Sequence, residues 1–192
     1  MQHLAGLAGH CLQAEPKLVL FEYGELGFLC DYLHMRRGTP HEPGQAQLVD
    51  FSHQIAEGMA FLHSRTVLVS ALSGRNIVLT TELHCMICHG AVVPESKDRF
   101  VFKGCAAPAI QWMAPESIAH HRFNNQSDVW SLGVTMWEVF TFGSVPFAQL
   151  ATGDLFYHLE LGMRPEQPES MPPAVRHLLQ RCWQFEPQAR PS

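Results

Sequence analysis

The stretch "SDVWSLGVTMWEVFTFGSVPF", residues 127–147, is the most informative part of the chain for its fold. Its pattern predicts a helix from Asp128 to about Thr141, with Ser127 as the N-cap because a serine hydroxyl accepts a backbone N–H at a helix start. Apolar residues lie on nearly every side of this helix, and a helix that is hydrophobic all round is buried. We therefore expect residues 127–141 to form a helix through the centre of a core.

The composition of the whole chain is that of a packed globular protein. The chain has 192 residues, of which 46% are hydrophobic and 16% charged, enough for one domain with a core. The net charge is −5 and the basic residues are scattered, so nothing predicts a nucleic-acid partner. No signal peptide is visible, and no apolar run reaches the roughly 18 residues of a membrane span. We expect no membrane contact by this segment itself.

The cysteines predict free thiols in a reducing compartment. Only one pair is close in sequence, and a chain of this size and hydrophobicity needs no disulfide scaffold. Unpaired cysteines are most often buried core residues. The six cysteines are Cys11, Cys30, Cys85, Cys88, Cys105 and Cys182.

Other helices are predicted around the central one. Residues 47–63 carry apolar side chains at steps of three and four, which places them on one helix face. Shorter helices are expected at 28–33 and 152–161, and Pro172 with Pro173 opens a last helix. The apolar face of the 47–63 helix consists of Leu48, Phe51, Ile55, Met59 and Leu62.

The strands are expected to be few and short. Strand-like segments occupy residues 17–22, 66–69, 77–79 and 83–88, with tight connections between the last three. Residues 89–111 have no period and are expected to form a long loop, which in a compact domain is usually functional or disordered.

Three segments together resemble the C-terminal lobe of a protein kinase, in particular one of the tyrosine-kinase kind. "QWMAPES" at 111–117 resembles the K-W-M-A-P-E that closes the activation segment, residues 127–147 resemble the core helix and following loop, and "RCWQFEPQARPS" at 181–192 resembles the final signature. "HLAGLAGHC" at 3–11 is similar to the stretch before the fourth strand of the small lobe. "LVLFEYGELGFLCDYL" at 18–33 is similar to the hinge.

The resemblance implies an α+β, protein-kinase-like fold with a mainly helical C-lobe, the hinge and the last small-lobe strands, and with most of the N-lobe absent. Residues 1–23 would be the end of the N-lobe and the start of the hinge. Residues 24–192 would be the C-lobe, truncated before its last helix. Within the C-lobe we expect the catalytic-loop region at 66–79, the activation segment at 89–116 and the core helix at 127–141.

The catalytic loop departs from the family pattern. A kinase of this kind carries H-R-D-L-A-A-R-N, and here Val69, Ser70 and Ala71 stand in place of H-R-D. Ala71 has no proton acceptor, and a general base is typically worth about 10² to 10⁴ in rate. Ser70 replaces the arginine that grips an activation-loop phosphate, and residues 89–116 contain no tyrosine. The usual phosphorylation switch therefore lacks both the arginine that binds the phosphate and the tyrosine that would carry it.

The metal-binding motif is also altered. About 13 residues after the loop asparagine the family has D-F-G, which here falls on His89, Gly90 and Ala91, or on Cys88, His89 and Gly90 after a one-residue deletion. Neither register supplies an aspartate, and histidine or cysteine is a poor ligand for Mg²⁺. We therefore expect no metal site and no ATP or Mg²⁺ cofactor. The nucleotide-binding remnants would be Phe21 (at the gatekeeper position), Glu22, Tyr23 and Asn76.

Residues 85–89 also spell C-x-x-C-H, the pattern of c-type haem attachment. On a strand, residues i and i+3 point to opposite faces, so Cys85 and Cys88 could not both reach one ligand. Zinc would need another close pair of cysteine or histidine. We interpret the segment as the eighth kinase strand followed by the altered motif, with haem or zinc as the disfavoured alternatives.

The residues that hold the fold together are retained. The resemblance pairs Glu116 with Arg190 in a buried ion pair and assigns Asp128 to the support of the catalytic-loop backbone. Trp112 is expected to be an aromatic anchor. The contrast with the altered loop predicts a pseudokinase: not an enzyme, but a scaffold or allosteric partner in receptor or kinase signalling. Its partner would be a protein, a kinase or a receptor, on the cytoplasmic side of the cell, where it fits the intracellular part of a membrane receptor.

Two alternatives stay open. The chain could be a weakly active, atypical tyrosine kinase that transfers the γ-phosphate of ATP to protein, with a carboxylate borrowed from Glu82, Glu95 or Asp98. It could also be a non-functional fragment of a larger kinase-like protein. In that case the interface between the lobes would expose apolar surface.

Overall fold

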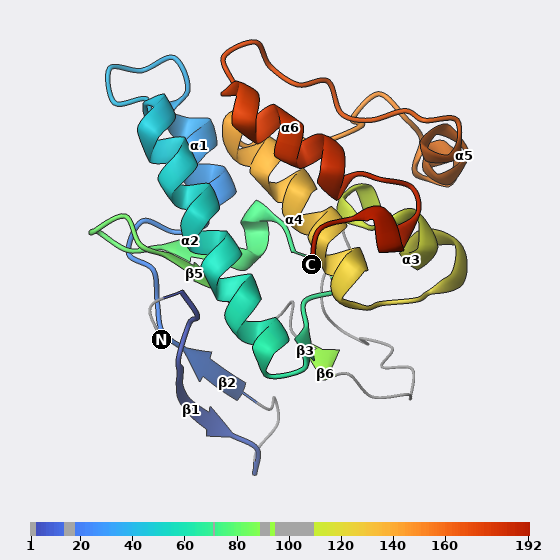
Figure 1. Ribbon diagram of the computed structural model, residues 1–192. Helices are drawn as coiled ribbons and strands as arrows, with labels where there is room; N and C mark the ends of the chain where they lie inside the picture. The colour runs from blue at the N-terminus through green and yellow to red at the C-terminus, as the bar shows by residue number, and fades with distance from the viewer. Residues whose placement is uncertain (1–2, 14–17, 71, 89–92, 95–109) are drawn as a thin grey trace.

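A computed structural model describes residues 3–13, 18–70, 72–88, 93–94 and 110–192 of the chain. It has a helical body with short strands at one end (Figure 1), which confirms the predicted α+β class. The elements in chain order are β1 (Leu7–Cys11), β2 (Leu18–Phe21), α1 (Leu29–Arg36), α2 (Gln45–Ser64), β3 (Val67–Leu68), η1 (Gly74–Asn76), β4 (Ile77–Leu79), β5 (Cys85–Ile87), β6 (Val93–Pro94), η3 (Ile110–Trp112), α3 (Pro115–His120), α4 (Asn125–Phe140), η4 (Thr152–Asp154), α5 (Leu155–Glu160), α6 (Pro173–Cys182) and η5 (Pro187–Ala189).

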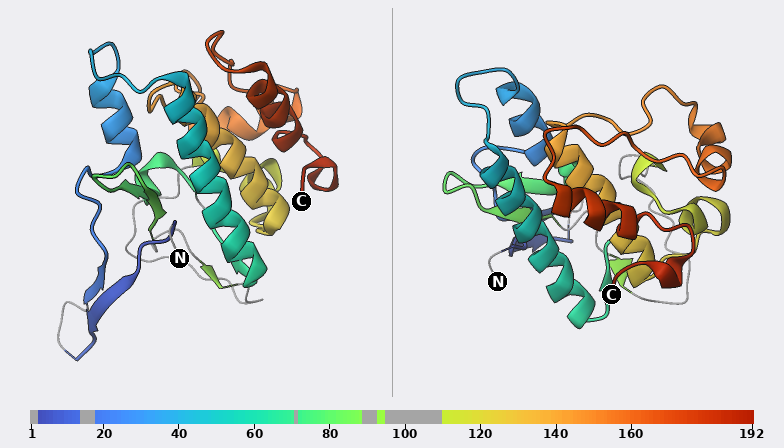
Figure 2. Two further views of the ribbon diagram at one scale, coloured as in Figure 1. Left: turned by 60° about the vertical axis from the view of Figure 1, so that its left-hand side comes forward. Right: turned by 45° about the horizontal axis from the view of Figure 1, so that its top comes forward.

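Helix α4 forms the centre of the core, as its all-round apolar pattern predicts. Trp130, Val134 and Phe140 have at most 2% of their surface exposed. Helices α2 and α6 both contact α4, and Figure 2 shows the three side by side. Each large apolar side chain buried in this way contributes about 1.5–3 kcal/mol relative to leaving it exposed. The central helix is therefore the main source of stability that positions the rest of the chain.

The predicted start of α4 was wrong. Asn124, not Ser127, is the N-cap, and the helix begins at Asn125. The Oδ1 of Asn124 accepts the Ser127 N–H at 2.8 Å, and the Asn124 N–H donates to Ser127 Oγ at 2.9 Å. This reciprocal capping box satisfies two backbone donors, whereas a single serine cap satisfies one. The pair therefore adds most of a turn to the helix.

Helix α2 confirms the predicted periodicity. Its bounds, Gln45–Ser64, extend the expected 47–63 by a few residues at the two ends. All five residues of the predicted apolar face are buried, at 6% exposure or less. These residues are Leu48, Phe51, Ile55, Met59 and Leu62.

The described strands form three antiparallel pairs: β1 with β2, β4 with β5, and β3 with β6. The strands predicted at 66–69, 77–79 and 83–88 are confirmed, although the first and last are shorter. Strand β6, at Val93–Pro94, was not predicted and lies inside the expected 89–111 loop. A two-residue strand has no period to detect, so only its pairing with β3 reveals it. The rest of that loop, 89–92 and 95–109, lies outside the described residues.

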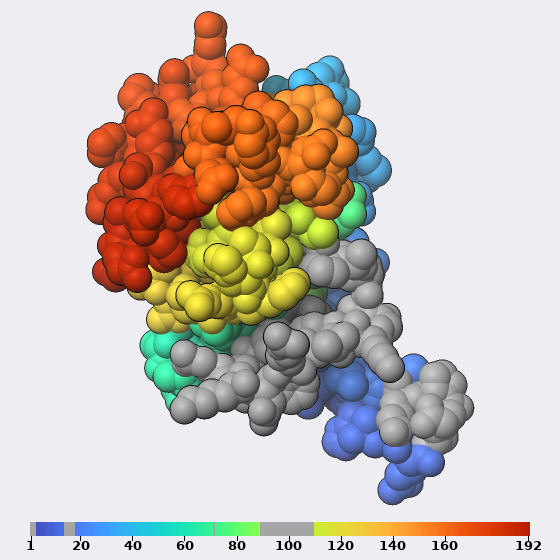
Figure 3. All heavy atoms as spheres, turned by 90° about the vertical axis from the view of Figure 1, so that its right-hand side faces the viewer, coloured from blue at the N-terminus to red at the C-terminus, as the bar shows by residue number. Residues whose placement is uncertain are grey.

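The β1–β2 hairpin extends away from the helical body (Figures 1 and 3). Its apolar side chains are largely exposed, between 51% and 61% for Leu7, Leu12, Leu18, Val19 and Leu20. Larger apolar patches on protein surfaces usually mark sites of interaction. The hairpin is thus the least covered part of the described structure.

Besides α4, the C-terminal half contains one α-helix that was predicted, one that was predicted in part and one that was not. Helix α6 begins at Pro173, as predicted, and the expected 152–161 helix is η4 followed by α5. Helix α3 was missed because six residues are too few to show a period. Among the described helices, none is both long enough and apolar enough to cross a bilayer.

Candidate functional site

The candidate site is the segment between β3 and β4, which the sequence marks as a catalytic-loop region. Its first N–H, from Val69, donates to Oδ2 of Asp128 at 2.7 Å. The same oxygen lies 3.0 Å from Nε2 of His63, at the end of α2. Asp128 is 1% exposed, and hydrogen bonds to a buried carboxylate are among the stronger ones in proteins. One carboxylate therefore ties α2, the start of the loop and α4 together.

A second buried carboxylate holds the other end of the loop. Oε2 of Glu138 accepts the Gly74 N–H at 2.9 Å and the indole N–H of Trp112 at 2.8 Å. Burial raises the pKa of Glu138 to about 7, although the two hydrogen bonds act in the opposite direction. A Cβ at position 74 would lie 2.8 Å from Oε1 of Glu138 and 3.0 Å from the Cβ of Cys30. Only glycine allows this close approach without a shift of its neighbours.

Two of the residues in this arrangement escaped prediction from the sequence. The expected residues Asp128 and Trp112 are in place, but His63 and Glu138 were not assigned any role. For Glu138 a signal existed, because it is an acid within the largely apolar stretch of α4 that follows Asp128. For His63 no local signal existed, since a polar residue at the end of a surface helix is unremarkable.

Asn76 and Cys88 lie next to each other in the structure. The backbone oxygen of Asn76 accepts the Cys88 N–H at 2.7 Å, and its Oδ1 accepts the hydroxyl of Ser73 at 3.0 Å. Burial raises the pKa of the Cys88 thiol, so this side chain stays protonated at neutral pH. A protonated thiol is not a ligand for a hard cation such as Mg²⁺.

The donor set at this point does not by itself fit a magnesium site. Mg²⁺ requires near-octahedral oxygen ligands, and Asn76 offers one side-chain oxygen that Ser73 already engages. Within the described part of the chain, no group of three or more acidic, histidine or cysteine side chains could hold a metal ion. Ala71, His89 and Gly90 lie outside the described residues, so their predicted roles remain predictions.

The residues of the C-x-x-C-H pattern differ in their surroundings. Cys85 is buried on β5, where its N–H donates to Oε1 of Gln54 at 2.7 Å, and burial raises the pKa of its thiol. Cys88 is partly exposed and follows the strand. Every cysteine that the structure describes is a free thiol.

The residues predicted to form the hinge lie beside β4. The Leu26 N–H donates to the Leu79 carbonyl oxygen at 3.0 Å, and the Leu79 N–H donates to the Gly27 carbonyl oxygen at 2.9 Å. A Cβ at Gly24 would lie 2.7 Å from the Cβ of Val78, so glycine lets the two segments touch. The hinge and the catalytic-loop region are thereby brought together.

The expected nucleotide-binding remnants of the hinge are accessible to different degrees. Phe21 is partly exposed at the end of β2, and the carboxylate of Glu22 accepts the Gly6 N–H at 2.9 Å. Tyr23 is 76% exposed. Ser70 lies in a turn after β3 and is partly exposed.

The structure brings Glu116 and Arg190 together in a two-pronged ion pair. Nη1 and Nη2 of Arg190 lie 2.6 and 2.8 Å from the two carboxylate oxygens of Glu116. Arg190 also donates to the carbonyl oxygens of Gln126, Gln184 and Phe185, and its guanidinium lies over the ring of Trp130 at 5.1 Å. This single side chain fastens α3 and the start of α4 to the end of the chain.

Of the three acids that could replace the missing catalytic carboxylate, only Glu82 lies among the described residues. Glu82 occupies the turn between β4 and β5, where Thr81 Oγ1 donates to its Oε1 at 2.9 Å. Hydrogen bonding, first with its own backbone, lowers the pKa of this exposed carboxyl. No hydrogen bond in the described structure joins it to Asn76. Glu95 and Asp98 lie outside the described residues.

The sequence of the chain is similar to those of known protein kinases. A family model described as protein tyrosine and serine/threonine kinase matches residues 1–192. The chain is 33% identical to the BDNF/NT-3 growth factors receptor of Gallus gallus over 98% of its length, covering 24% of that protein. It is 31% identical to the tyrosine-protein kinase csk-1 of Caenorhabditis elegans over 99%, covering 35%. It is 41% identical to the vascular endothelial growth factor receptor 3 of Mus musculus over 76%, covering 11%.

These matches contradict the expectation that the chain is not an enzyme. The matched family is one of enzymes, and relatives aligned over 99% of the chain carry the name tyrosine-protein kinase. The prediction rested on the altered loop, whereas the family match covers residues 1–192. The chain spans only about a tenth to a third of the length of the relatives named above, between 11% and 35%.

Proposed function

Because this chain belongs to the protein tyrosine and serine/threonine kinase family, we propose that it forms the larger-lobe part of a tyrosine-kinase-type domain in receptor or kinase signalling. We further propose that it takes part in slow transfer of the γ-phosphate of ATP to protein. The observation that carries this proposal is the support of the loop backbone by the buried carboxylates of Asp128 and Glu138.

The retained support matters because phosphoryl transfer depends on positioning and electrostatics more than on covalent chemistry by the protein. The N–H groups of Val69 and Gly74 are fixed by hydrogen bonds to the buried carboxyl groups of Asp128 and Glu138, one at each end of the loop. Asn76 follows directly and its backbone is tied to Cys88. Both ends of the loop are thus held through backbone N–H groups rather than through side chains.

The rate should nevertheless be low. Ala71 cannot accept a proton, which removes a contribution of about 10² to 10⁴ to the rate. The donors around Asn76 do not complete a magnesium site, so we propose that this segment alone binds ATP and Mg²⁺ weakly. When bound in a complete domain, the nucleotide would supply the phosphoryl group. The chain's own contribution is to hold the loop and the hinge beside each other.

A second candidate function is binding, as a scaffold or allosteric partner of a kinase or receptor. The Glu116–Arg190 pair and the buried α4 preserve a rigid surface, and rigid surfaces bind with little entropy loss. The exposed apolar hairpin offers a further contact area. This role does not require phosphoryl transfer and can accompany it.

The proposal is tested by following radiolabelled phosphate from ATP to a glutamate–tyrosine copolymer, using the complete domain that contains this chain. We expect turnover about 10² to 10⁴ below that of a relative with an intact loop. Asn76→Ala should abolish it, whereas Gln188→Ala, at an exposed site far from the loop in sequence, should leave it unchanged. Transfer equal to that of a mock-purified sample would overturn slow transfer, and only the binding role would remain.

A further inference from the structure

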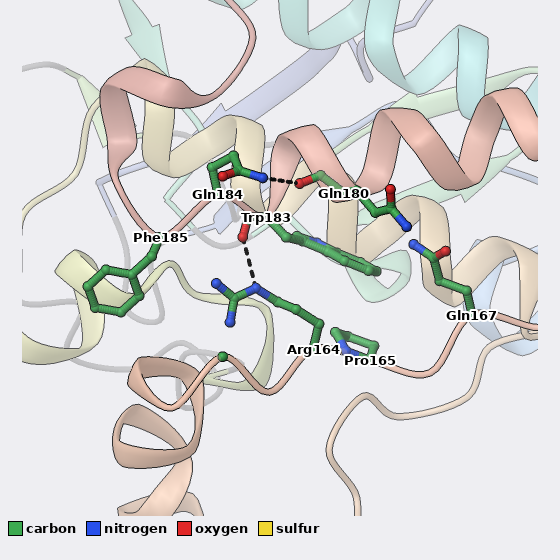
Figure 4. A pocket seen from close by; sticks show the side chains of 8 residues that line it. Arg164, Pro165, Gln167, Gln180, Trp183, Gln184 and Phe185 are labelled. Carbon is green, nitrogen blue, oxygen red and sulfur yellow. Dashed lines mark hydrogen bonds between the residues drawn. The ribbon is translucent and has the colours of Figure 1, made fainter.

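A hollow of about 700 Å³ lies between the α5–α6 connection and the end of α6 (Figure 4). The connection contributes Arg164 and Gln167 to its lining, and α6 with the residues that follow contributes Gln180, Trp183 and Gln184. None of these residues belongs to the hinge or the catalytic-loop region. We call this site the glutamine hollow.

Arg164 is the only charged residue in the lining of the glutamine hollow. Its Nε donates to the carbonyl oxygen of Trp183 at 2.8 Å, and its Nη1 donates to those of Leu159 and Met163 at 3.0 and 2.7 Å. These bonds hold the guanidinium in place, and Figure 4 shows it beside Trp183. In the described part of the chain, Nη2 has no hydrogen-bond partner.

This guanidinium lies over the ring of Trp130 at 5.0 Å, but it has no counter-ion among the described residues. Arg190 pairs with Glu116, but no carboxylate of the described residues lies within ion-pair distance of Arg164. Burial, and then the charge of Arg190, lower the pKa of Arg164. A partly buried cation without a counter-ion costs free energy, and an anion that pairs with it recovers part of that cost.

The remaining donors indicate which anion fits. Nε and Nη1 are already used, so Arg164 cannot offer the two-nitrogen fork by which arginine grips a phosphate. No second cation lines the hollow to balance the nearly double charge of a phosphate group. A single carboxylate oxygen, by contrast, needs only the N–H groups of Nη2.

The glutamine side chains suit a peptide backbone beside that carboxylate. Gln167 uses its Nε2 on the carbonyl oxygen of Arg176 at 3.3 Å, which leaves its side-chain oxygen as an acceptor. The side chain of Gln180 has no hydrogen bond in the described structure and is exposed. A side-chain amide offers both a donor and an acceptor, as each peptide unit does.

We propose that the glutamine hollow binds an extended segment of a partner protein through an aspartate or glutamate side chain that pairs with Arg164. Charge favours this occupant, because the described lining of the hollow presents one cation without a counter-ion and no acid. This binding is independent of phosphoryl transfer, and it would survive if the proposed transfer failed.

A neighbouring hollow predicts more of the partner's sequence. Phe185, which is 36% exposed, lines both the glutamine hollow and a second one of about 210 Å³. The second hollow carries the carboxylates of Glu160 and Glu186, together with His120 and with Glu116, which pairs with Arg190. A segment that crosses Phe185 should therefore place a basic side chain on that side.

The test titrates the 192-residue chain with the capped peptide acetyl-Ala-Glu-Ala-amide while the ¹H–¹⁵N signal of the Trp183 indole is recorded. We expect a saturable shift with a dissociation constant of about a millimolar, the range for one ion pair and a few amide contacts. The matched peptide with glutamine in place of glutamate should bind at least about fivefold more weakly.

Substitutions locate the site without removing Arg164, which supports the local backbone. Gln180→Glu places a negative charge in the hollow and should weaken binding of the glutamate peptide about tenfold. Gln188→Glu adds the same charge outside both hollows and should change binding less than about twofold. Equal binding of the two peptides, or equal effects of the two variants, would overturn the proposal. Inorganic phosphate that binds more tightly than the glutamate peptide would also overturn it, in favour of a phosphate site.

Discussion

Carboxylates hold both the region around Arg190 and the catalytic-loop region, but they bind different groups in the two regions. In the first, a charged side chain meets its charged partner, and Glu116 with Arg190 makes two hydrogen bonds of 2.6 and 2.8 Å. In the second, the buried acids Asp128 and Glu138 hold backbone N–H groups rather than side chains. Hydrogen bonds to backbone N–H groups do not depend on the side chains of the donors, although position 74 has room only for glycine. The difference explains how this chain retains the family fold around an altered catalytic sequence.

The largest expected effect tests the first region. Arg190→Met leaves the Glu116 carboxylate without its cation and three carbonyl oxygens without their donor. Breaking one side of a buried pair costs about 3–5 kcal/mol of unfolding free energy. Urea denaturation of the variant should show this loss, while Gln188→Ala, two residues away and exposed, should stay within about 0.5 kcal/mol.

A loss of less than about 1 kcal/mol of unfolding free energy in Arg190→Met would contradict the claim that a buried ion pair holds this region, since an exposed ion pair contributes that much. The region around Arg190 would then depend on packing against Trp130 and not on its charges. A double variant with Glu116→Gln separates the two contributions, because coupled partners lose less together than the sum of their single losses.

The next effect tests the second region through pH. The pKa of the Glu138 carboxyl is raised from 4.5 to about 7 by burial, so the folded chain keeps this proton at a pH at which the unfolded chain releases it. The resulting stability is fully present below about pH 4.5, declines as the pH rises to about 7, and is constant above. One pKa unit corresponds to about 1.4 kcal/mol, so the total is about 3 kcal/mol.

The measurement is urea denaturation at several pH values between about 5 and 8, on the chain and on Glu138→Gln. The glutamine oxygen can still accept the Gly74 and Trp112 N–H groups but has no proton to lose. Other titrating groups are common to both proteins, so the difference between the two curves isolates Glu138. Parallel curves would mean that the carboxyl titrates as in the unfolded chain, and that solvent reaches the second region.

The sequence predicts much of the fold and less of the site, for identifiable reasons. The all-round apolar pattern of residues 127–141 and the single face of 47–63 are periodic over several turns, and both helices are found. The predicted start of α4 was wrong because Asn124 and Ser127 are both good N-cap residues, and the sequence does not show which of them is the cap. In the structure Asn124 is the N-cap and Ser127 is its partner in the capping box. Elements of two to six residues, β6 and α3, carry no period and were missed.

The same distinction applies to the candidate site. Asp128, Trp112, Glu116 and Arg190 belong to segments that resemble the family, and they could be named in advance. The partners Glu138 and His63 act through positions that only the packing of α2, α4 and the loop brings together. The prediction that the chain is not an enzyme was wrong, because it rested on the altered H-R-D and D-F-G motifs rather than on the whole chain. A missing group reduces a rate by a finite factor, and family membership rests on the whole chain.

The smallest expected effect comes from adding one methyl group at Gly74, which tests how firmly the Glu138 carboxylate is held. The family loop has alanine where this chain has Gly74, so Gly74→Ala restores the family letter. The added Cβ would lie 2.8 Å from Oε1 of Glu138, whose other oxygen is held by two hydrogen bonds. Overpacking of this kind costs about 1–3 kcal/mol, while Gly153→Ala, with no atom within 4 Å of its new Cβ, should stay within about 0.5 kcal/mol in the same urea experiment. Equal stability of the two variants would show that the Glu138 carboxylate can move aside. The loop would then be held less rigidly than the Arg190 region, because its support yields to a single methyl group.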